Sequence, residues 1–419
     1  MGKIVRKKQI VLILLATVLV SMCAGVVMAK RLPAHGGVYE QLKVFTEALS
    51  YVESNYVDEV ESAKVIQGAI RGMLRTLDPH SSFMPPEVYR EMQVETEGRF
   101  GGLGIEITMR DDVLTVVSPI EGTPAFRAGI QPGDQIIKVD GESTKEMSLV
   151  DAVKKLRGPE GSAVTIAIFR QGFTEPKDFT LSRAVIQIKS VRWTKLKDDI
   201  GYIKLRSFHK TTEEELEEAL RDLGEQQIKA LVLDLRNNPG GLLEQAIAVS
   251  NVFLEGGQLI VYTKGRLPNQ NMKGFAKSNG FHVTYPVAVL INGGSASASE
   301  IVAGALQDLN RATVIGTQSF GKGSVQTIIP LSDGSGLRLT TAKYYTPKGG
   351  EIHGKGIIPD IVVEKPQEAE NPEGEQKSPR NRRQIELPGD DLTDDPQLQK
   401  AVDILKTHKQ QGGKSVKAG

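Results

Sequence analysis

The chain has 419 residues, of which 39% are hydrophobic and 25% charged, so it has an ordinary globular composition and the length of about two to four domains. This composition excludes a miniprotein, a collagen and a wholly disordered chain. Lys and Arg number 52 against 51 Asp and Glu, so there is no basic excess of the kind that indicates nucleic-acid binding. The single cysteine, Cys23, lies near the N-terminus. The chain after it therefore has no disulfide, no thiol nucleophile and no Cys-ligated metal.

The first 29 residues have the pattern of an export signal. Four basic residues lie within the first eight, and residues 9–29 contain no charged residue. Val27-Met28-Ala29 fits a signal peptidase site, whereas the uncharged run is also long enough for an uncleaved membrane anchor of ~20 residues. Both alternatives place the protein outside the cytoplasm. We expect it to be periplasmic or extracytoplasmic, either secreted or anchored to the inner membrane through residues 9–29.

Residues 36–96 are predicted to be an N-terminal helical region. Apolar residues recur at spacings of three and four over 38–56 and again over 62–77, which predicts two amphipathic helices. Such a pair usually packs or dimerises, so we expect a homo-oligomer, either a dimer or a larger ring.

Residues 97–186 have the pattern of a small β-rich module. Short runs of β-forming residues alternate with turn signals such as Pro132-Gly133-Asp134, and one helix is predicted over Leu149–Leu156. The sequence FGGLGIEI places glycines directly before a strand. Free N–H groups there can hold a peptide's terminal carboxylate while the strand edge pairs with the peptide; the alternative is a structural hairpin turn. The candidate peptide-binding residues are Gly101, Gly102, Leu103, Gly104 and Ile105.

Residues 187–363 alternate between predicted strands and helices, which indicates a largely parallel α/β core. Strands are predicted over 229–235, 258–262, 286–291 and 312–315, and helices over 212–223, 242–253 and 298–309. Residues 364–392 are polar and contain prolines, so they are predicted to be a linker. Residues 393–419 are predicted to form a short helix over 397–406 and a tail.

A serine at the start of the predicted helix 298–309 is a candidate nucleophile. A buried strand leads into a turn of Gly and Ser, and the helix follows at once. Free N–H groups and the helix dipole favour negative charge at this point, as a serine nucleophile and its oxyanion require. The alternative is that Ser295, Ser297 and Ser299 only cap the helix.

A serine nucleophile needs a base, and lysine is the candidate that the sequence offers. No GxSxG or HExxH motif is present, and none of the six histidines has a catalytic context. Lys322 lies in a glycine-dense loop where desolvation would lower its pKa toward the useful range of ~7 to 8, and Gln326 follows four residues later in an extended run. Two alternatives are a solvated lysine in a glycine turn and a nucleotide P-loop. The P-loop requires a helix where residues 324–331 have a strand pattern.

Five segments together resemble the C-terminal processing peptidases, also called tail-specific proteases. They match that family in order and spacing over about residues 38–363. The segments are FGGLGIEI (100–107), SPIEGTPAFRAGIQPGDQIIKVDGE (118–142), DLRNNPGGLL (234–243), GSASASE (294–300) and FGKGSVQT (320–327).

The resemblance implies a multidomain α/β protein. Its PDZ domain would span 97–186, and its serine protease core, over 187–363, would resemble the ClpP/crotonase-type ββα fold. By motif position Ser297 looks like the nucleophile, Lys322 like the general base and Gln326 like the residue that orients the lysine. The oxyanion hole looks like the backbone N–H groups of Gly241 and Ala298, with Gly240 as the alternative to Gly241.

Two functions follow as expectations. The first is an exported serine endopeptidase that captures apolar C-terminal tails in its PDZ domain and cleaves them through an acyl-enzyme, without metal or cofactor and with a possible activating adaptor. The second is a catalytically silent PDZ adaptor that binds protein C-termini. Nucleic acid is not an expected partner in either case.

Overall fold

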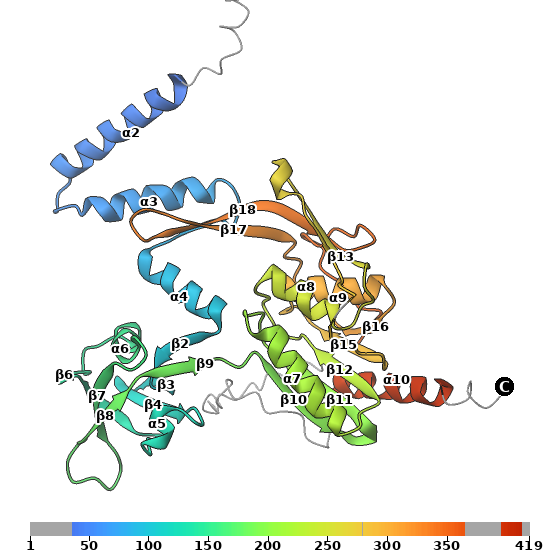
Figure 1. The fold of residues 1–419 in the computed structure, drawn as a ribbon. Coiled ribbons are helices and arrows are strands. Elements are labelled where there is room, and N and C mark those ends of the chain that lie inside the picture. The colour runs from blue at the N-terminus through green and yellow to red at the C-terminus, as the bar shows by residue number, and fades with distance from the viewer. Residues whose placement is uncertain (1–35, 279, 365–394, 413–419) are drawn as a thin grey trace, which may run out of the picture. The chain divides into compact units, whose positions relative to one another are not determined.

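The computed structural model describes residues 36–278, 280–364 and 395–412 (Figure 1). The chain divides into two compact units, Met1–Leu77 and Asp78–Gly419. In the first unit the two predicted amphipathic helices are present as α2 (Gly36–Asn55) and α3 (Ser62–Arg75). The predicted signal or anchor lies outside the described residues. None of the helices within them is long and apolar enough to cross a membrane.

The β-rich module belongs to the second unit. Strands β2 (Arg99–Gly102) and β9 (Ala184–Gln187) pair at its entrance and exit, and α6 (Leu149–Leu156) has the predicted bounds. The main sheet has the order β3-β4-β5-β7-β8, so β3 lies at an edge. Its strands are β3 (Ile105–Arg110), β4 (Val113–Pro119), β5 (Gln135–Val139) with β6 (Glu142–Ser143) beside it, β7 (Ala163–Phe169) and β8 (Lys177–Ser182); the short helix α5 (Pro124–Arg127) follows β4.

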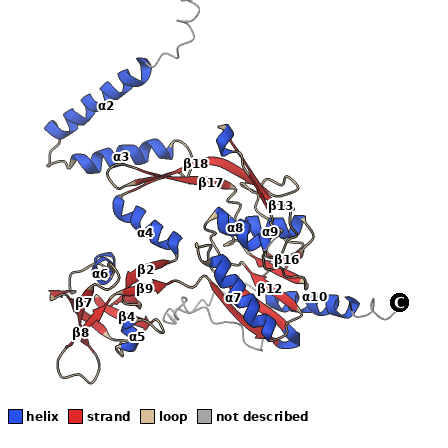
Figure 2. Cartoon of the chain, in the orientation of Figure 1, coloured by secondary structure: helices blue, strands red, loops and turns tan. Residues whose placement is uncertain are grey.

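The α/β core, whose strands are red in Figure 2, is built on a six-stranded sheet of order β10-β11-β12-β15-β16-β19. Strand β10 pairs antiparallel with β11, and every other pair is parallel, so the predicted largely parallel α/β core is confirmed. The strands are β10 (Val191–Leu196), β11 (Ile200–Leu205), β12 (Ala230–Asp234), β15 (Val287–Ile291), β16 (Ala312–Gly316) and β19 (Ile361–Val362), and the 3₁₀ helix η1 (Lys197–Asp199) joins the first two.

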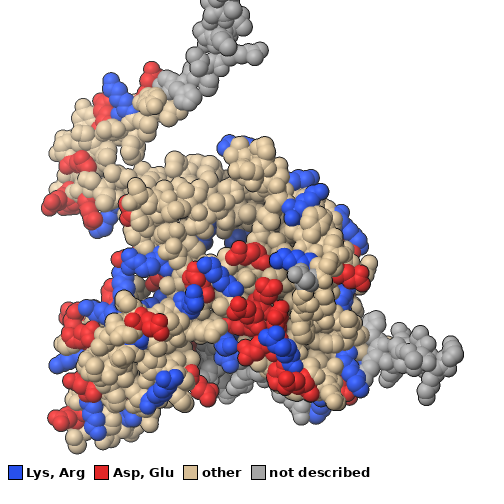
Figure 3. Space-filling model, viewed as in Figure 1, with Lys and Arg blue, Asp and Glu red and all other residues tan. Residues whose placement is uncertain are grey.

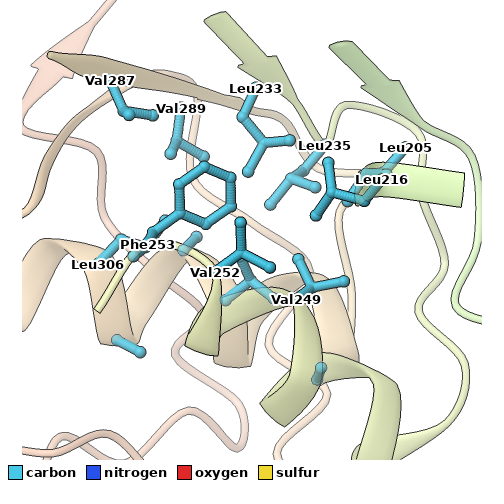
Figure 4. Close-up of a cluster of buried hydrophobic side chains, with 14 of the residues drawn as sticks. Leu205, Leu216, Leu233, Leu235, Val249, Val252, Phe253, Val287, Val289 and Leu306 are labelled. Atoms are coloured by element: carbon cyan, nitrogen blue, oxygen red, sulfur yellow. The ribbon is translucent and has the colours of Figure 1, made fainter. Parts of the chain in front are cut away.

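Helices cover both faces of this sheet. On one face α7 (Thr212–Glu225), α8 (Leu243–Asn251) and α9 (Ala298–Asp308) bury the larger apolar cluster, of which Figure 4 shows Leu233, Val289 and Phe253. On the other face α10 (Pro396–Gly412) buries Leu398, Val402 and Leu405 against the strands. A strand that is covered on both faces has a continuous run of apolar residues in its sequence. This is why the positions of these strands could be predicted.

A second sheet in the core was not predicted. It has the order β1-β18-β13-β14, with β17 paired to β18. The run predicted over 258–262 forms β13, which pairs antiparallel in this sheet, so its assignment to the parallel core was wrong. Likewise β1 and α4 come from the region assigned to the N-terminal helices. The elements are β1 (Ser82–Met84), α4 (Pro86–Glu97), β13 (Leu259–Gly265), the 3₁₀ helix η2 (Pro268–Gln270), β14 (Lys273–Phe275), β17 (Ser324–Pro330) and β18 (Gly336–Tyr345).

A buried ion network joins α10 to the end of β12. The Arg236 guanidinium donates to both oxygens of Asp395, at 2.7 and 2.8 Å, and also to Asp234. Burial opposes ionisation of Asp234, but Lys204 and Arg236 outweigh it and lower the pKa of that carboxyl to about 2. The network is therefore fully charged at neutral pH and ties the last helix to the strand that enters the 237–241 turn.

Asp395→Asn is expected to lower the free energy of unfolding by about 1–3 kcal/mol, because Arg236 loses its bidentate carboxylate partner while staying buried. Chemical denaturation measures this change. Asp403→Asn, on an exposed position of the same helix, is the matched control and should leave the unfolding midpoint unchanged. Equal midpoints for the two variants would contradict the role of the network.

Lysines, arginines and acidic residues are interspersed over the face of the molecule shown in Figure 3. This distribution agrees with the near-equal totals of the two signs in the sequence.

Candidate active site

Ser297 lies at the junction between β15 and α9, as the sequence predicts. It is the N-cap of α9 and has φ 59° and ψ −116°, a backbone conformation that L-residues rarely adopt. A non-glycine residue held in this conformation at a strand–turn–helix junction presents its side chain at the start of the helix. The half-buried hydroxyl therefore lies where the free N–H groups and the helix dipole favour negative charge.

The two neighbouring serines have structural partners. Ser295 Oγ donates to the carbonyl of Leu235 at 2.8 Å, and Ser299 Oγ donates to that of Asn238 at 3.0 Å. Both hydroxyls are fully buried, and both fasten the start of α9 to the turn after β12. Of the three serines, Ser297 is thus the one whose hydroxyl is available to a substrate.

Glu300 joins the Ser297 backbone to the Lys322 loop. Its fully buried carboxylate accepts from Ser297 N at 2.8 Å and from Lys322 N at 2.9 Å through one oxygen. The other oxygen accepts from Ser319 Oγ at 2.5 Å and from Gly321 N at 2.7 Å. One carboxylate therefore sets the position of both candidate catalytic residues. The sequence analysis missed it, although its place three residues after Ser297 is that of a capping-box glutamate.

Lys322 lies in the glycine loop directly before β17. Burial lowers the pKa of its amine, the positive charge of Arg338 lowers it further, and Glu300 acts in the opposite direction. The net direction favours the neutral amine that a general base needs. Because β17 is a strand, this loop has no helix N-terminus to bind phosphate, so the P-loop alternative is excluded.

The turn after β12 approaches Ser297 closely. A Cβ atom at Gly240 would lie 2.7 Å from Ser297 Cβ and 3.0 Å from the N atom of Ala298. The Gly240 N–H already donates to Asn238 Oδ1 at 2.9 Å. Among the described residues, the N–H groups of Gly241 and Ala298 have no acceptor. This favours Gly241 over Gly240 as the donor that pairs with Ala298.

Tyr344 lies beside both candidate catalytic residues. Its phenol donates to the carbonyl of Lys322, and the side chain of Ser297 lies close enough to influence the phenol. Burial raises its pKa far above the ordinary value, so the phenol stays neutral. Within the described part of the chain no hydrogen bond joins Ser297 Oγ to Lys322 Nζ. The structure therefore shows the two candidate residues close together but without the hydrogen bond of a working dyad.

Gln326 lies on β17, four residues after Lys322. Its amide nitrogen donates to the carbonyl of His80 at 2.9 Å, which fixes the side chain and leaves its amide oxygen available. The contact with residue 80 comes from the segment that adds β1 to the second sheet. Sequence spacing could place Gln326 near the lysine but could not show what holds it.

A Ser–His pair also occurs outside this cluster. Ser207 Oγ and His209 Nε2 are 2.7 Å apart, and burial lowers the pKa of the histidine. Ser207 follows strand β11 rather than starting a helix, and His209 Nδ1 is buried without a partner among the described residues. The pair thus lacks both the oxyanion donors and the orienting carboxylate of a serine–histidine catalytic site.

The candidate peptide site of the β-rich module differs in part from its prediction. Gly101 and Gly102 belong to strand β2, so the turn is limited to Leu103 and Gly104, whose φ is 75°. Leu103 is buried in the core of the module, and Ile105 opens the edge strand β3, which contacts α6. An edge strand facing a helix is suited to pairing with an extended peptide.

Comparison with known proteins assigns the family. Residues 199–363 match the model of peptidase family S41, residues 115–170 match a PDZ domain, and residues 26–88 match the N-terminal domain of the activating protease CtpB. The chain is 49% identical over 347 residues to a carboxy-terminal-processing protease of Bartonella bacilliformis, covering 81% of this chain and 80% of that protein. The chain belongs to the C-terminal processing peptidases of family S41. It is a serine-type C-terminal processing peptidase with a PDZ domain.

Further relatives agree with this assignment. The carboxy-terminal processing protease CtpB of Bacillus subtilis is 38% identical over 324 residues, which cover 76% of this chain and 67% of that protein. Among solved structures, a photosystem II D1 C-terminal processing protease is 31% identical with a TM-score of 0.44, covering 76% of this chain and 92% of that one. The family models and curated relatives confirm the predicted family and enzyme class, and the sheets and helices of the described residues confirm the multidomain α/β fold.

Proposed function

We propose that this peptidase is exported, captures protein C-terminal tails in its PDZ domain and cleaves them with a Ser297/Lys322 dyad. The observation that supports the dyad best is the Glu300 carboxylate, which binds the backbone N–H of both residues. A shared buried anchor holds two loops in a fixed relation, as a catalytic pair requires.

In the proposed reaction, neutral Lys322 accepts the proton of the Ser297 hydroxyl while Oγ attacks the peptide carbonyl. The N–H groups of Gly241 and Ala298 hold the oxyanion, and the lysine ammonium then protonates the leaving amine as the peptide C–N bond breaks. Water hydrolyses the acyl-enzyme in the second half, with Lys322 again as base. The Ser297 hydroxyl must first turn to Lys322, and we propose that substrate binding drives this rotation.

The proposed tail capture rests on the edge strand β3 and its preceding turn. This edge strand contacts α6, and we propose that a peptide adds a strand beside β3 while free N–H groups of the turn receive its terminal carboxylate. Export rests on the basic and uncharged pattern of residues 1–29.

We also propose that the chain forms oligomers, and the support for this comes from the first unit. Its helix α2 exposes many large apolar side chains, with Tyr39 72% exposed and Val38 64%. An apolar surface of this kind suits a second copy of the chain or an activating partner. Others on the same helix are Leu42, Val44, Phe45, Tyr51 and Val52.

Tail cleavage tests the proposed function. The purified chain is expected to cleave a protein with an unstructured apolar tail, and Ser297→Ala should reduce cleavage by more than about 10³-fold while still binding the tail. Amidating the substrate's terminal carboxylate should raise KM, because the PDZ turn loses its charged ligand. Mass spectrometry of the cleavage products measures the rate for each variant and for each form of the tail.

Ser207→Ala is the matched control and should keep wild-type activity, since that serine lies outside the cluster. Tail binding by the wild type without any hydrolysis would support the adaptor alternative instead. Equal KM for the free and amidated tails would contradict capture of the carboxylate.

A further inference from the structure

The hydrogen-bonding geometry of a lysine base sets a requirement that the dyad alone does not meet. A neutral amine has one lone pair and two N–H donors. If the lone pair faces the Ser297 hydroxyl, the two N–H groups need acceptors, or the amine rotates freely and the lone pair is seldom aligned. This inference rests on the proposed role of Lys322 as the base.

Gln326 can supply one acceptor. Because its amide nitrogen is committed to the His80 carbonyl, its amide oxygen is the free end of the side chain. Glu300 is not a candidate for the second acceptor, since its two oxygens already accept four hydrogen bonds. A second neutral acceptor close to Lys322 is therefore needed.

Ser324 is placed to supply it. It is the first residue of β17, two residues after the loop residue Lys322, and it shares a face of the strand with Gln326 two residues later. The serine is only 4% exposed, yet its Oγ has no hydrogen-bond partner among the described residues. A buried hydroxyl without a partner costs about 1–3 kcal/mol, so its presence calls for a functional explanation.

A residue packed against the lysine loop, His353, also has an unpaired polar atom. His353 Nδ1 is likewise buried and without a partner in the described part of the chain. The backbone of His353 packs directly against Gly323, the residue before Ser324. Two unpaired polar atoms thus occur next to the lysine loop, one a hydroxyl and the other a ring nitrogen.

We propose that Ser324 is a positioning residue for the base: its Oγ accepts an N–H of Lys322, so that Ser324 and Gln326 together aim the lone pair at Ser297. The interaction strengthens when Lys322 takes up the serine proton, because hydrogen bonds to a charged donor are the stronger ones. Ser324 therefore acts mainly in the transition state and lowers the barrier rather than binding substrate.

Ser324→Ala tests this role through opposite effects on activity and stability. We expect kcat for tail cleavage to fall about 10- to 100-fold with KM within about twofold of wild type, which corresponds to the loss of one charge-assisted hydrogen bond. The unfolding midpoint should be unchanged or higher, because the substitution removes an unpaired buried hydroxyl. Ser324→Thr keeps the hydroxyl on a strand residue and should recover most of the activity.

Ser335→Ala is the matched control at the other end of the β17–β18 hairpin. Its hydroxyl is fully buried but donates to Asp333 at 2.5 Å, so the substitution should lower the unfolding midpoint and leave kcat unchanged. Full kcat in Ser324→Ala, or a loss of kcat matched by a loss of stability, would overturn the proposal. The dyad itself fails if Ser297→Ala or Lys322→Ala remains active, so the two failures are distinguishable.

Discussion

Lys322→Ala is expected to reduce kcat/KM for tail cleavage by more than about 10³-fold, because general-base catalysis and the alignment of Ser297 are lost together. Binding of the tail should persist. Steady-state cleavage and a separate binding measurement on the inactive variant give the two quantities.

The pH dependence of kcat/KM tests whether Lys322 acts as the neutral base. Burial lowers the Lys322 pKa, so the neutral amine forms at a lower pH than for an ordinary lysine, and kcat/KM should rise with pH through that lowered value. Between the lowered pKa and the ordinary value of ~10.4, Lys322 is protonated in the unfolded chain but neutral in the folded one. Stability therefore rises with pH across this range, and below it the buried charge of Lys322 destabilises the fold. Lys322→Ala should consequently not lower the unfolding midpoint at neutral pH.

Lys322→Arg is the matched control for charge. A guanidinium keeps the positive charge but does not deprotonate in proteins, so this variant should be as inactive as Lys322→Ala. Substantial activity in the arginine variant would show that the charge of Lys322, and not its proton transfer, is what cleavage requires.

Glu300→Gln should also abolish activity, and here stability should fall with it. The amide NH₂ of glutamine cannot accept, so two of the four donors that now bind the carboxylate lose their acceptor. At about 1–3 kcal/mol for each unpaired donor, the free energy of unfolding should fall by roughly 2–6 kcal/mol. Denaturant unfolding and cleavage assays on the same preparation measure both effects.

Glu244→Gln provides the comparison for Glu300. Glu244 lies in the first turn of the neighbouring helix α8 but is exposed, so its replacement should change neither activity nor stability by more than ~0.5 kcal/mol. If Glu300→Gln behaved like Glu244→Gln, the buried carboxylate would not be what positions Ser297 and Lys322.

The sequence predicted those features that depend on local pattern. Helix α6 has its predicted bounds, and the strand–turn–helix pattern around Ser297 correctly places it at the start of α9. The spacing of apolar residues and the residues that cap a helix depend on only a few neighbouring positions. They can therefore be recognised in the sequence without a structure.

Contacts between distant segments could not be predicted in this way. Strand β1 has three residues and pairs with β18 some 250 positions later, too short a run for its periodicity to identify. Arg236 meets Asp395 across the predicted linker, and nothing local in either sequence marks the pair. Glu300 was missed because two of the donors that bind its carboxylate come from a loop that follows β16.

The most direct test of the account is where and how fast a serine-directed fluorophosphonate reacts with the enzyme. The account predicts a single phosphonyl adduct on Ser297, located by peptide mapping, whose rate of formation rises with pH and falls sharply in Lys322→Ala. An adduct on another serine, such as Ser207, or undiminished tail cleavage by Ser297→Ala, would contradict it.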